Sequence, residues 1–554
     1  MNNRYYMFAL STFLCCLLLL FTLYPSLRIT TYSPNHRKKD IFQMFDKKHA
    51  YATIICDNSI IEPTLVSIYS LQLAFSKKPS SKADVIVLIP DSIYIENDSI
   101  QQLERLDTKI IRTSFAQSSC MNSQHALLNL WAMLDYKKIV YFTHDVLFDK
   151  DVDQLFYQLP NSAILSNQLS PSLLLLEPSP DHFESMVRDY KTSKSIQLQL
   201  HNATNKLLQH LYVYNGPMKP WNFHMYNDTD WSKHYDPIPF YYWRKASNGL
   251  RHFLNPVSEW KNQQRQNDVC DGYLQSINNI HHFTVQDKFS VMISTYNPER
   301  IERISLLIRH LLKSDMVHTI YITWHNPNLD VPASIYDSIQ DHSRLKVLKQ
   351  SYDSLNNRFN PVDDLKTEAV YIMDDDIFID LQDLESAFNV WRSRKDSVVG
   401  HFPRLHRYDP ETHQASYKVT NRAPYTLVLT KSMFIRSEYL FAYTCLLEPK
   451  LHEYVDQALN CEDLGFAMMA SGLSRTPSTF VCNEKPIEDF GRKKGISINN
   501  NHMPARADCI SNFITQFWNE QDPLLKSYDA VAPFARSVIK TGNWARVETI
   551  ISNE

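Results

Sequence analysis

The sequence predicts a chain of two α/β domains preceded by one N-terminal membrane span. The chain has 554 residues, which is too long for a single hydrophobic core. Residues 5–24 form an apolar run without a charge. After this run, two successive segments alternate apolar strands with amphipathic helices, a pattern typical of mainly parallel sheets covered on both faces. The predicted fold class is therefore α/β.

Residues 1–24 are predicted to be a cytoplasmic tip and a signal anchor. About 20 residues are needed to span the bilayer core, and the apolar run meets that length. A cleaved signal peptide is the alternative, but the run is longer than a usual signal core and no small-x-small site follows it. Residues 25–48 are polar and basic, as expected of a stem. We therefore expect a type II protein of the Golgi or endoplasmic reticulum membrane, with the bulk of the chain in the lumen.

Glycosylation sequons and cysteines agree with a lumenal location. The chain has nine cysteines, and those outside the membrane span are compatible with a few disulfides in an oxidising compartment. Three Asn-x-Ser/Thr sequons are acceptors for N-linked glycans in such a compartment. They lie at Asn97, Asn202 and Asn227.

The first α/β domain is predicted over residues 49–260. Apolar strands are expected at 51–57, 83–90, 138–148 and 172–179, with a helix at 124–134. The polar residues 261–287 are predicted to be a linker.

The second domain, predicted over residues 288–520, repeats the plan. Strands are expected at 289–295, 319–326, 369–376 and 397–402, and helices at 302–312 and 380–394. In the second helix an apolar stripe at helical spacing is expected to face the core. Its members are Leu381, Leu384, Phe388 and Trp391. Residues 521–554 are predicted to be a helical or extended tail.

Composition excludes two kinds of partner site. Lys and Arg number 57 against 60 Asp and Glu, and no basic stripe indicates nucleic acid. Glycine numbers only 9, and no glycine-rich phosphate loop is present. Any bound phosphate must then be held by a metal ion, arginine or histidine.

Three consecutive aspartates, Asp374 to Asp376, follow the apolar strand "AVYIM". Ligands bind at the carboxyl ends of strands in open α/β sheets. Residues i and i+2 of an extended chain point the same way, so Asp374 and Asp376 can face one cleft while Asp375 turns toward the neighbouring loops. Carboxylate oxygens suit Mn²⁺ or Mg²⁺. The alternative is an acidic turn that caps a helix beginning near Leu381.

Several motifs in this half occur in the order and spacing of a known family. The stretches "SLNNRFNPVDDLKTEAVYIMDDD", "YTLVLTKSMFI" and "NCEDLGFAMMASGLSRTP" resemble the exostosin-type glycosyltransferases, family 64, and the likeness covers residues 289–518. The resemblance implies a GT-A fold that transfers a sugar from a nucleotide-sugar donor with retention of the anomeric configuration. It also implies a metal ion on a D-x-D pair, here Asp374 and Asp376.

The resemblance assigns roles to single residues. Asn326 in "TWHN" matches an asparagine near the nucleotide, and Arg358 in "NNRF" matches an arginine near the donor pyrophosphate. Asp374 and Asp375 are likewise assigned to the donor. Asp463 in "NCEDLG" matches the carboxylate under the reacting sugar. From the residues alone, Asp463 is also compatible with favouring the dipole of a helix beginning near it.

A C-terminal segment, "HMPARADC", matches groups that close on the diphosphate. They are His502 and Arg506. Family members carry a disulfide that corresponds to Cys461 and Cys509. Two other cysteines stay open as partners: Cys445 and Cys482.

Two positions depart from the family. Pro298 stands where some relatives carry arginine, and Arg300 or Arg303 is a candidate substitute. Asp353 stands where some animal members carry a nucleotide-contacting asparagine. Both departures leave the nucleotide base and the sugar open.

The first half resembles family 8, the glycogenin-like glycosyltransferases. "LLNLWAMLDYKKIVYFTHDVLF" and "GPMKPWN" carry the likeness. Thr143 replaces the first aspartate of that family's D-x-D, and only Asp145 remains. We expect a degenerate domain with a structural or acceptor-binding role; an active second transferase is the alternative.

The sequence as a whole predicts a metal-dependent retaining glycosyltransferase of the secretory pathway. The expected donor is a UDP-linked N-acetylhexosamine, and the acceptor a glycan, glycolipid or glycoprotein joined by an α linkage. A GDP-sugar transferase of the mannosyl type and an inactive glycan-binding partner subunit are the alternatives. Homo- or hetero-oligomers are compatible with this prediction, and no nucleic acid is expected.

Overall fold

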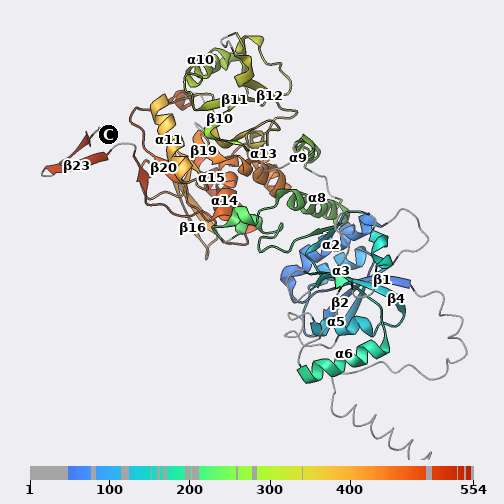
Figure 1. Cartoon of the computed structure of the whole chain (residues 1–554). Helices are drawn as coiled ribbons and strands as arrows, with labels where there is room; N and C mark the ends of the chain where they lie inside the picture. Colours follow the sequence, from blue (N-terminus) through green and yellow to red (C-terminus); the bar gives the residue numbers. More distant parts are fainter. Residues whose placement is uncertain are drawn as a thin grey trace, which may run out of the picture. The chain divides into compact units, whose positions relative to one another are not determined.

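The computed structural model describes the greater part of the chain in ordered segments (Figure 1). These segments are residues 48–75, 83–113, 124–150, 152–158, 162–165, 171–193, 201–202, 211–226, 228–256, 260–276, 283–337, 339, 341–493, 502–532, 535–541 and 544–550. Within them no helix has the length and apolar content needed to cross a membrane. The predicted anchor, the predicted stem up to residue 47 and Asn227 lie outside the described residues, whereas Asn97 is exposed at the start of a helix.

The chain divides into two compact units. The first comprises the residues up to Asn215 together with Gly249–Asn255, and the second comprises Gly216–Asn248 together with the residues from Pro256 onward. Each unit is built around one large sheet.

The sheet of the first unit has seven strands in the order β3-β2-β1-β4-β7-β6-β8. Strands β1 to β4 run parallel, β7 is antiparallel to both β4 and β6, and β6 pairs parallel with β8. The strands are β1 (Lys48–Ile54), β2 (Asp84–Pro90), β3 (Thr108–Thr113), β4 (Tyr136–Phe142), β6 (Ser162–Leu165), β7 (Pro171–Leu176) and β8 (His201–Asn202), with β5 (Val146–Phe148) and β9 (Leu211–Val213) forming a separate pair.

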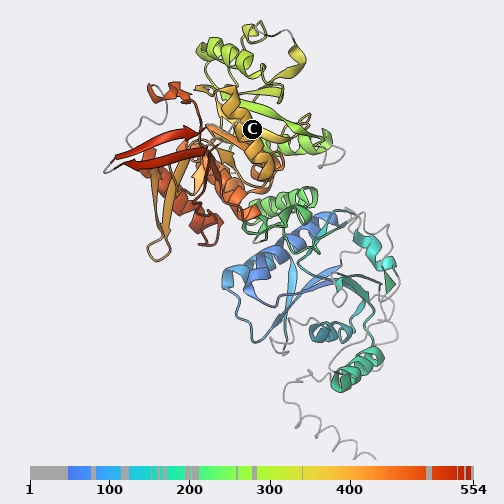
Figure 2. The same ribbon diagram turned by 60° about the vertical axis from the view of Figure 1, so that its left-hand side comes forward.

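Helices cover both faces of this sheet, which is why its central strands are apolar throughout. Alternate residues of β1, β2, β4 and β7 form one core with α5 (Gln124–Trp131) and with partly buried residues of α6 (Pro180–Ser193). Figure 2 shows α2 (Ile61–Ala74) on the opposite side of the sheet. The remaining helical segments are α3 (Asn97–Arg105), η3 (Asn58–Ile60) and η5 (Val152–Tyr157).

The sheet of the second unit has eight strands in the order β12-β11-β10-β13-β19-β15-β20-β22. Strands β10 to β13 run parallel, and β19 is antiparallel to both of its neighbours. The strands are β10 (Val285–Thr295), β11 (Val317–Trp324), β12 (Leu345–Lys349), β13 (Thr367–Asp374), β15 (Val399–Gly400), β19 (Ser432–Arg436), β20 (Thr479–Val481) and β22 (Ala530–Val531).

Three small sheets accompany this large one. A three-stranded sheet contains β16 (Pro403–Asp409), β17 (Gln414–Val419) and β18 (Leu427–Val428). Strand β14 (Ile377–Phe378) pairs with β21 (Glu488–Asp489), and β23 (Ala535–Thr541) pairs with β24 (Trp544–Ile550).

The longer helices of the second unit pack on the large sheet or beside it. They are α8 (Pro237–Leu254, which begins in this unit), α9 (Gln263–Ser276), α10 (Ile301–Leu311), α11 (Leu381–Ser393), α13 (Pro449–Ala458), α14 (Glu462–Ser474) and α15 (His502–Phe517). Shorter segments are α12 (Glu438–Phe441), the π-helical η12 (Ala442–Leu446), η6 (Phe223–Met225), η7 (Trp231–Lys233), η8 (Pro298–Arg300), η9 (Ala333–Ile335), η10 (His342–Arg344), η11 (Leu355–Phe359) and η13 (Phe490–Lys493).

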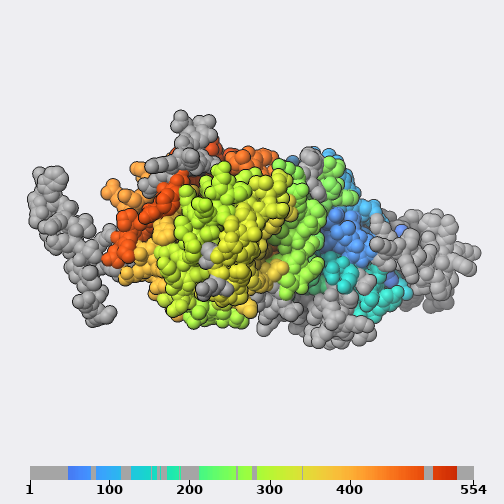
Figure 3. Space-filling view, turned by 90° about the horizontal axis from the view of Figure 1, so that it is seen from above, coloured from blue at the N-terminus to red at the C-terminus, as the bar shows by residue number. Residues whose placement is uncertain are grey.

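The predicted apolar stripe of α11 is confirmed. Leu384, Phe388 and Trp391 are fully buried in the core with strands β10, β11 and β13, and Leu381 packs against that core. Helix α10 packs into the same core through Ile304, Leu307 and Ile308. Figure 3 shows the yellow-green residues of this part of the second unit on the face seen from above.

The two large sheets share one strand order. Strands β3-β2-β1-β4-β7-β6 of the first unit correspond in sequence and direction to β12-β11-β10-β13-β19-β15 of the second. In both, the first strand of the unit has the second and third strands on one side and the fourth on the other. Each unit therefore has a point at the carboxyl ends of its central strands where the strand order reverses.

Three predicted boundaries need correction. Residues 216–248 were expected in the first domain but pack in the second unit: His224 Nε2 lies 2.8 Å from the Phe517 carbonyl oxygen, and the Trp518 indole donates to the His224 carbonyl. Gly472 allows this approach, because a Cβ there would lie 2.1 Å from that carbonyl oxygen. Such contacts between distant segments leave no hydropathy signal.

The predicted linker also differs from the structure. Within residues 261–287, Gln263–Ser276 form helix α9, and a disulfide joins Cys270 to Cys445. The predicted tail begins inside the fold as well, since the Asp522 carboxylate lies 2.8 Å from His406 Nε2 and β22 extends the large sheet.

Candidate active site

The three aspartates lie at the reversal point of the second sheet. Strand β13 ends at Asp374, which is in register with Ser294 of β10. Strands β11 and β12 lie on the far side of β10, so the crevice outside the ends of β10 and β13 is the place where open α/β sheets bind ligands. The sequence-predicted position of the triplet and this crevice coincide.

The three carboxylates alternate in direction. The side chain of Asp375 is 4% exposed, whereas those of Asp374 and Asp376 are 22% and 13% exposed. Asp374 and Asp376 therefore open toward the crevice, and Asp375 points into the protein. The extended backbone expected for the whole triplet ends at Asp374, because Asp375 and Asp376 lie in the turn that follows β13.

Arg300 supplies positive charge to the triplet. Its guanidinium hydrogen-bonds to the Asp375 carboxylate and lies 3.8 Å from Asp376 Oδ2. Arg303, the other candidate, instead lies over the ring of Phe490 at 5.0 Å. Of the two candidates, Arg300 is thus the one that contacts the triplet.

Asp376 is the least compensated of the three. Burial, followed by the charges of Asp374 and Asp375, raises the pKa of Asp376 to about 6. Its Oδ1 atom is buried and has no hydrogen-bond partner within the described part of the chain. Gly491 sits against its other oxygen, where a Cβ would lie 2.4 Å from Oδ2. A buried oxygen in this state favours a nearby cation.

Arg358 connects the triplet to a second acidic pair. It lies in η11, and its guanidinium donates to Thr430 Oγ1 at 2.5 Å and to Asp374 Oδ1 at 3.1 Å. Its Nη1 atom also lies 3.4 Å from Glu462 Oε1. Burial alone would lower the pKa of this arginine, but the carboxylates of Asp374 and Glu462 offset burial and leave the pKa raised.

Glu462 and Asp463 form the first turn of α14. Burial is the main cause that raises the pKa of Glu462 to about 7, although Arg358 opposes it. Asp463 Oδ2 accepts a 2.5 Å hydrogen bond from Arg506, which lies on α15. Arg506 also donates to Asn460 Oδ1 at 3.1 Å. Acidic residues at the N-terminus of a helix are favoured by the helix dipole. The position of Asp463 is therefore compatible with this structural role as well as with a functional one.

The predicted bridge between α14 and α15 is present. The structure joins Cys461 to Cys509, and Cys445 pairs with Cys270 instead. Cys461 and the neighbouring Leu459 both have left-handed backbones, with φ of 78° and 46°. The chain therefore turns sharply before Glu462, and the disulfide fixes that turn beside the segment that carries Arg506.

Two residues predicted to bind the donor, Asn326 and His502, have different surroundings from the charged residues described above. Asn326 follows β11 and is buried, and its side-chain oxygen accepts a hydrogen bond from the backbone of Asn328 at 3.0 Å. His502 begins α15, but its side chain lies outside the described residues. Asp353, the second departure from the family, is exposed, and burial followed by the charge of Asp456 raises its pKa.

Sequence reasoning missed two residues beside Asp463. The Tyr417 ring lies 4.7 Å from the guanidinium of Arg506, and Arg404 interacts electrostatically with Tyr417, Arg506 and Asp463. Arg404 and Tyr417 come from the paired strands β16 and β17. In the sequence, polar residues alternate along these two strands. This pattern predicts strands, but it does not predict that Arg404 and Tyr417 lie near Asp463.

The reversal point of the first unit carries a different set. Thr143 follows β4, and its hydroxyl is buried without a hydrogen-bond partner in the described residues. His144 Nε2 lies 3.6 Å from Asp145 Oδ1. One carboxylate therefore stands where the second unit has three.

Comparison with known proteins decides the family. The model of the glycosyl transferase family 64 domain matches residues 289–535. Glycosyltransferase family protein 64 C3 of Arabidopsis thaliana is 32% identical over 266 residues, which are 44% of this chain and 80% of that protein. The chain belongs to glycosyltransferase family 64. It is therefore a glycosyltransferase, and the family match extends past the predicted domain end at residue 520.

Other relatives found by the comparison carry different names, one that of a mannosyl transferase and another that of an exostosin. Glycosylinositol phosphorylceramide mannosyl transferase 1 of Arabidopsis thaliana is 28% identical over 245 residues, covering 41% of this chain and 72% of that protein. Exostosin-2 of Homo sapiens is 30% identical over 239 residues but is covered over only 32% of its length. Among solved structures, the glycosyltransferase GlyE of Streptococcus pneumoniae matches with 12% identity and a TM-score of 0.27. The match covers 56% of this chain and 81% of the GlyE chain. The likeness of the first unit to family 8 stays a prediction.

Proposed function

We propose that the second unit transfers a sugar from a nucleotide-sugar donor to a glycan or glycolipid acceptor, with an α linkage and retention of configuration. One observation carries this proposal. Carboxylates and guanidiniums form a row of three ion-paired groups at the carboxyl end of the sheet: Asp376, Arg300 and Asp375; Asp374, Arg358 and Glu462; and Asp463 with Arg506. When the bond to sugar C1 breaks, negative charge develops on the diphosphate and positive charge on the sugar. The guanidiniums of this row can stabilise the first and its carboxylates the second.

A divalent ion, Mn²⁺ or Mg²⁺, is proposed to sit between Asp374 and Asp376. Their partly exposed oxygens and the unpartnered Asp376 Oδ1 fit a hard cation. Among the residues that the structure describes, no three Asp, Glu, His or Cys side chains gather as in a site made of protein ligands alone. Ions of this kind commonly use one or two carboxylates together with substrate phosphates. When bound, the ion would offset negative charge on the leaving diphosphate.

The chain's own arginines would serve the same leaving group. Arg358 already points one guanidinium edge at Asp374, and Arg506 is held on α15 beside Asp463. The planar fork of donors in arginine suits phosphate oxygens. Asp463 is the carboxylate proposed to lie under the reacting sugar, where it stabilises positive charge at C1 or orients the acceptor hydroxyl. Asn326, Asp375 and His502 complete the proposed donor-binding set.

The donor is proposed to be a UDP-linked N-acetylhexosamine. A GDP-linked mannosyl donor is the second candidate, supported by the similarity to a mannosyl transferase of glycosylinositol phosphorylceramide. A donor screen with the purified chain and Mn²⁺ tests both, with release of free UDP or GDP as the readout. Release from UDP-N-acetylglucosamine or UDP-N-acetylgalactosamine supports the first candidate, and release from GDP-mannose the second. Absence of release and of nucleotide binding across the panel would leave the inactive glycan-binding subunit as the better account.

The first unit is proposed to be a family 8-like domain that has lost transfer activity. Thr143 offers no charge to a cation, and its buried hydroxyl lacks a partner in the described residues. A structural or acceptor-binding role then remains for this unit. The proposed setting is the lumen of the Golgi or endoplasmic reticulum, with residues 1–24 as the anchor.

A further inference from the structure

Asp456 of α13 joins two segments that are distant in the sequence. Its Oδ2 atom accepts hydrogen bonds from Trp260 Nε1 at 3.1 Å and from Asn262 Nδ2 at 2.8 Å. Its Oδ1 atom accepts from Ser354 Oγ and, at 3.1 Å, from Asn356 Nδ2. One carboxylate thus connects the residues before α9 with the residues that begin η11, the segment that carries Arg358.

The start of η11 is held from several sides. Ser354 Oγ accepts a hydrogen bond from the backbone of Asn356 at 3.1 Å and so caps the segment. The Asn356 side chain is 2% exposed, donates to the His452 carbonyl at 3.1 Å and accepts from the Tyr443 hydroxyl at 2.7 Å. Because each of its polar atoms has a partner, this side chain leaves η11 little freedom to shift.

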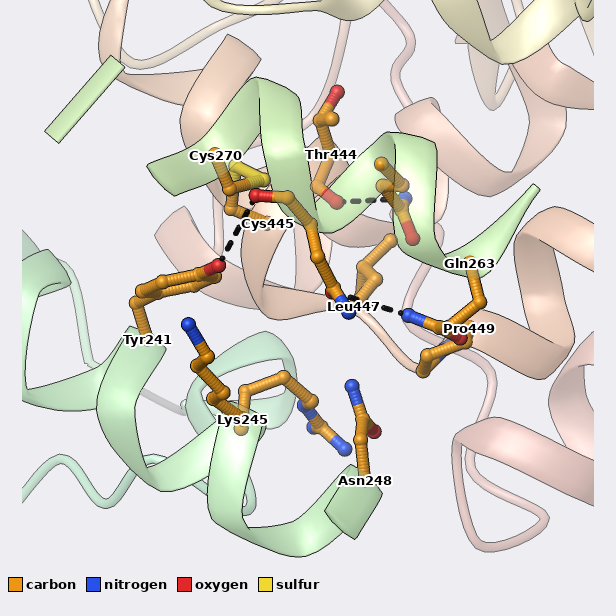
Figure 4. A pocket seen from close by; sticks show the side chains of 12 residues that line it. Tyr241, Lys245, Asn248, Gln263, Cys270, Thr444, Cys445, Leu447 and Pro449 are labelled. Atoms are coloured by element: carbon orange, nitrogen blue, oxygen red, sulfur yellow. Dashed lines mark hydrogen bonds between the residues drawn. A yellow bond between two sulfur atoms is a disulfide. The ribbon is translucent and has the colours of Figure 1, made fainter. Parts of the chain in front are cut away.

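Helix α9 reaches the other end of η11. Gln266 Nε2 donates to the Thr444 carbonyl at 2.8 Å, and Thr444 Oγ1 donates to the Phe359 carbonyl at 2.9 Å. The next residue, Cys445, is bonded to Cys270 of α9. Figure 4 shows this disulfide and Thr444 beside a small pocket between α8, α9 and residues 444–449. Residues 260–276, which we call the brace, therefore support η11 at both ends.

Arg358 lies one residue before the end of η11, between these two supports. Its guanidinium is 10% exposed and contacts Thr430, Asp374 and Glu462. A change in the backbone of η11 would move this guanidinium relative to the carboxylates, since Arg358 is part of that segment.

We propose that Asp456 is a positioning residue for Arg358 and that the brace acts on donor binding through it. The inference rests on the proposed function, because it takes Arg358 as a ligand of the donor diphosphate. Asp456 makes no contact with the carboxylate row among the described contacts; its effect is transmitted through Ser354 and Asn356.

Asp456→Asn tests this in the full chain. The asparagine amide keeps the shape of the carboxylate, but its NH₂ group replaces one acceptor oxygen. This group then faces donors, either Trp260 and Asn262 or Ser354 and Asn356. We expect the dissociation constant for UDP or GDP, measured with Mn²⁺ by calorimetry, to rise about tenfold. Trp260→Phe removes one donor and keeps a ring stacked on His452, so it should act in the same direction with a smaller factor. Asp230→Asn is the matched control: this carboxylate lies outside the brace, pairs with Lys233 on the surface at 2.8 Å and should leave nucleotide affinity unchanged when it is replaced.

A double-mutant cycle separates positioning from a general loss of structure. If Asp456 acts through Arg358, Asp456→Asn should not weaken nucleotide binding further in an Arg358→Ala background. Additive losses, or unchanged affinity in both Asp456→Asn and Trp260→Phe, would overturn the proposal. If Arg358→Ala itself binds nucleotide as well as the unchanged chain does, the assigned role of Arg358 in the proposed function fails, which is a distinct result.

Discussion

Arg506 and Asp463 form an ion pair that is almost closed to solvent, and Arg506→Gln tests what it contributes. The oxygen and nitrogen lie 2.5 Å apart, and each side chain is 6% exposed. Removing one partner leaves a buried charge without compensation, which costs about 3–5 kcal/mol. The second unit has about 330 residues, and with an unfolding entropy of about 2.1 cal/mol/K per residue each kcal/mol moves its thermal midpoint by about 1.5 °C. We therefore expect the midpoint of the second unit to fall by about 6 °C.

The assay is thermal unfolding of single and double variants under non-reducing conditions. Asp463→Asn should also lower the midpoint, because Arg506 then loses its ion-pair partner, although it keeps Asn460 and the face of Tyr417. The double variant should lose about 2 kcal/mol less than the sum of the single losses. Asp230→Asn, which breaks a 2.8 Å pair with Lys233 on the surface, is the matched control and should not shift the midpoint. Additive losses in the double variant would refute the view that the pair acts as a unit.

Four further outcomes are expected. Asp376→Asn should abolish turnover without lowering the metal-free midpoint at pH 7.5; activity that survives this change, or survives EDTA, would contradict the proposed ion. Because the folded-state pKa of Asp376 is raised to about 6, its protonation favours the folded state at low pH, so metal-free stability should fall as pH rises from about 4 to 6, and Asp376→Asn should remove that slope. Cys509→Ser should weaken nucleotide binding and lower the midpoint together, since the bridge closes a 48-residue separation worth at most about 4 kcal/mol; a free Cys461 in non-reduced peptide maps of the unchanged protein would contradict the pairing. Asp145→Ala should leave donor turnover intact, and a loss without unfolding would show that the first unit is active.

Apolar patterning predicted the central elements closely. The helices expected at 302–312 and 380–394 appear as Ile301–Leu311 and Leu381–Ser393, and the strand at 319–326 appears as Val317–Trp324. The Asp triplet followed from the same pattern, because a carboxyl end of a buried strand is visible in the sequence itself.

Helix α9 was missed for a physical reason. Its buried face is formed by Gln263, Gln266, Cys270 and Tyr273, which recur at helical spacing. Two of these residues are glutamines that are buried because they find hydrogen-bond partners, so a search for apolar periodicity does not detect the face. Tyr417 and Arg404 were missed for a related reason, since their proximity to Asp463 arises from the pairing of two strands and not from any local spacing.

The two disulfides of the second unit have a practical consequence for producing this protein. Cys461–Cys509 joins the turn before Glu462 to the helix of Arg506, and Cys270–Cys445 joins the brace to the support of Arg358. Arg358 and Arg506 are thus positioned by segments that disulfides connect. In a reducing bacterial cytosol these segments would be held by non-covalent contacts alone. Material from such a host should be checked for both bridges before any lack of activity is ascribed to the wrong donor.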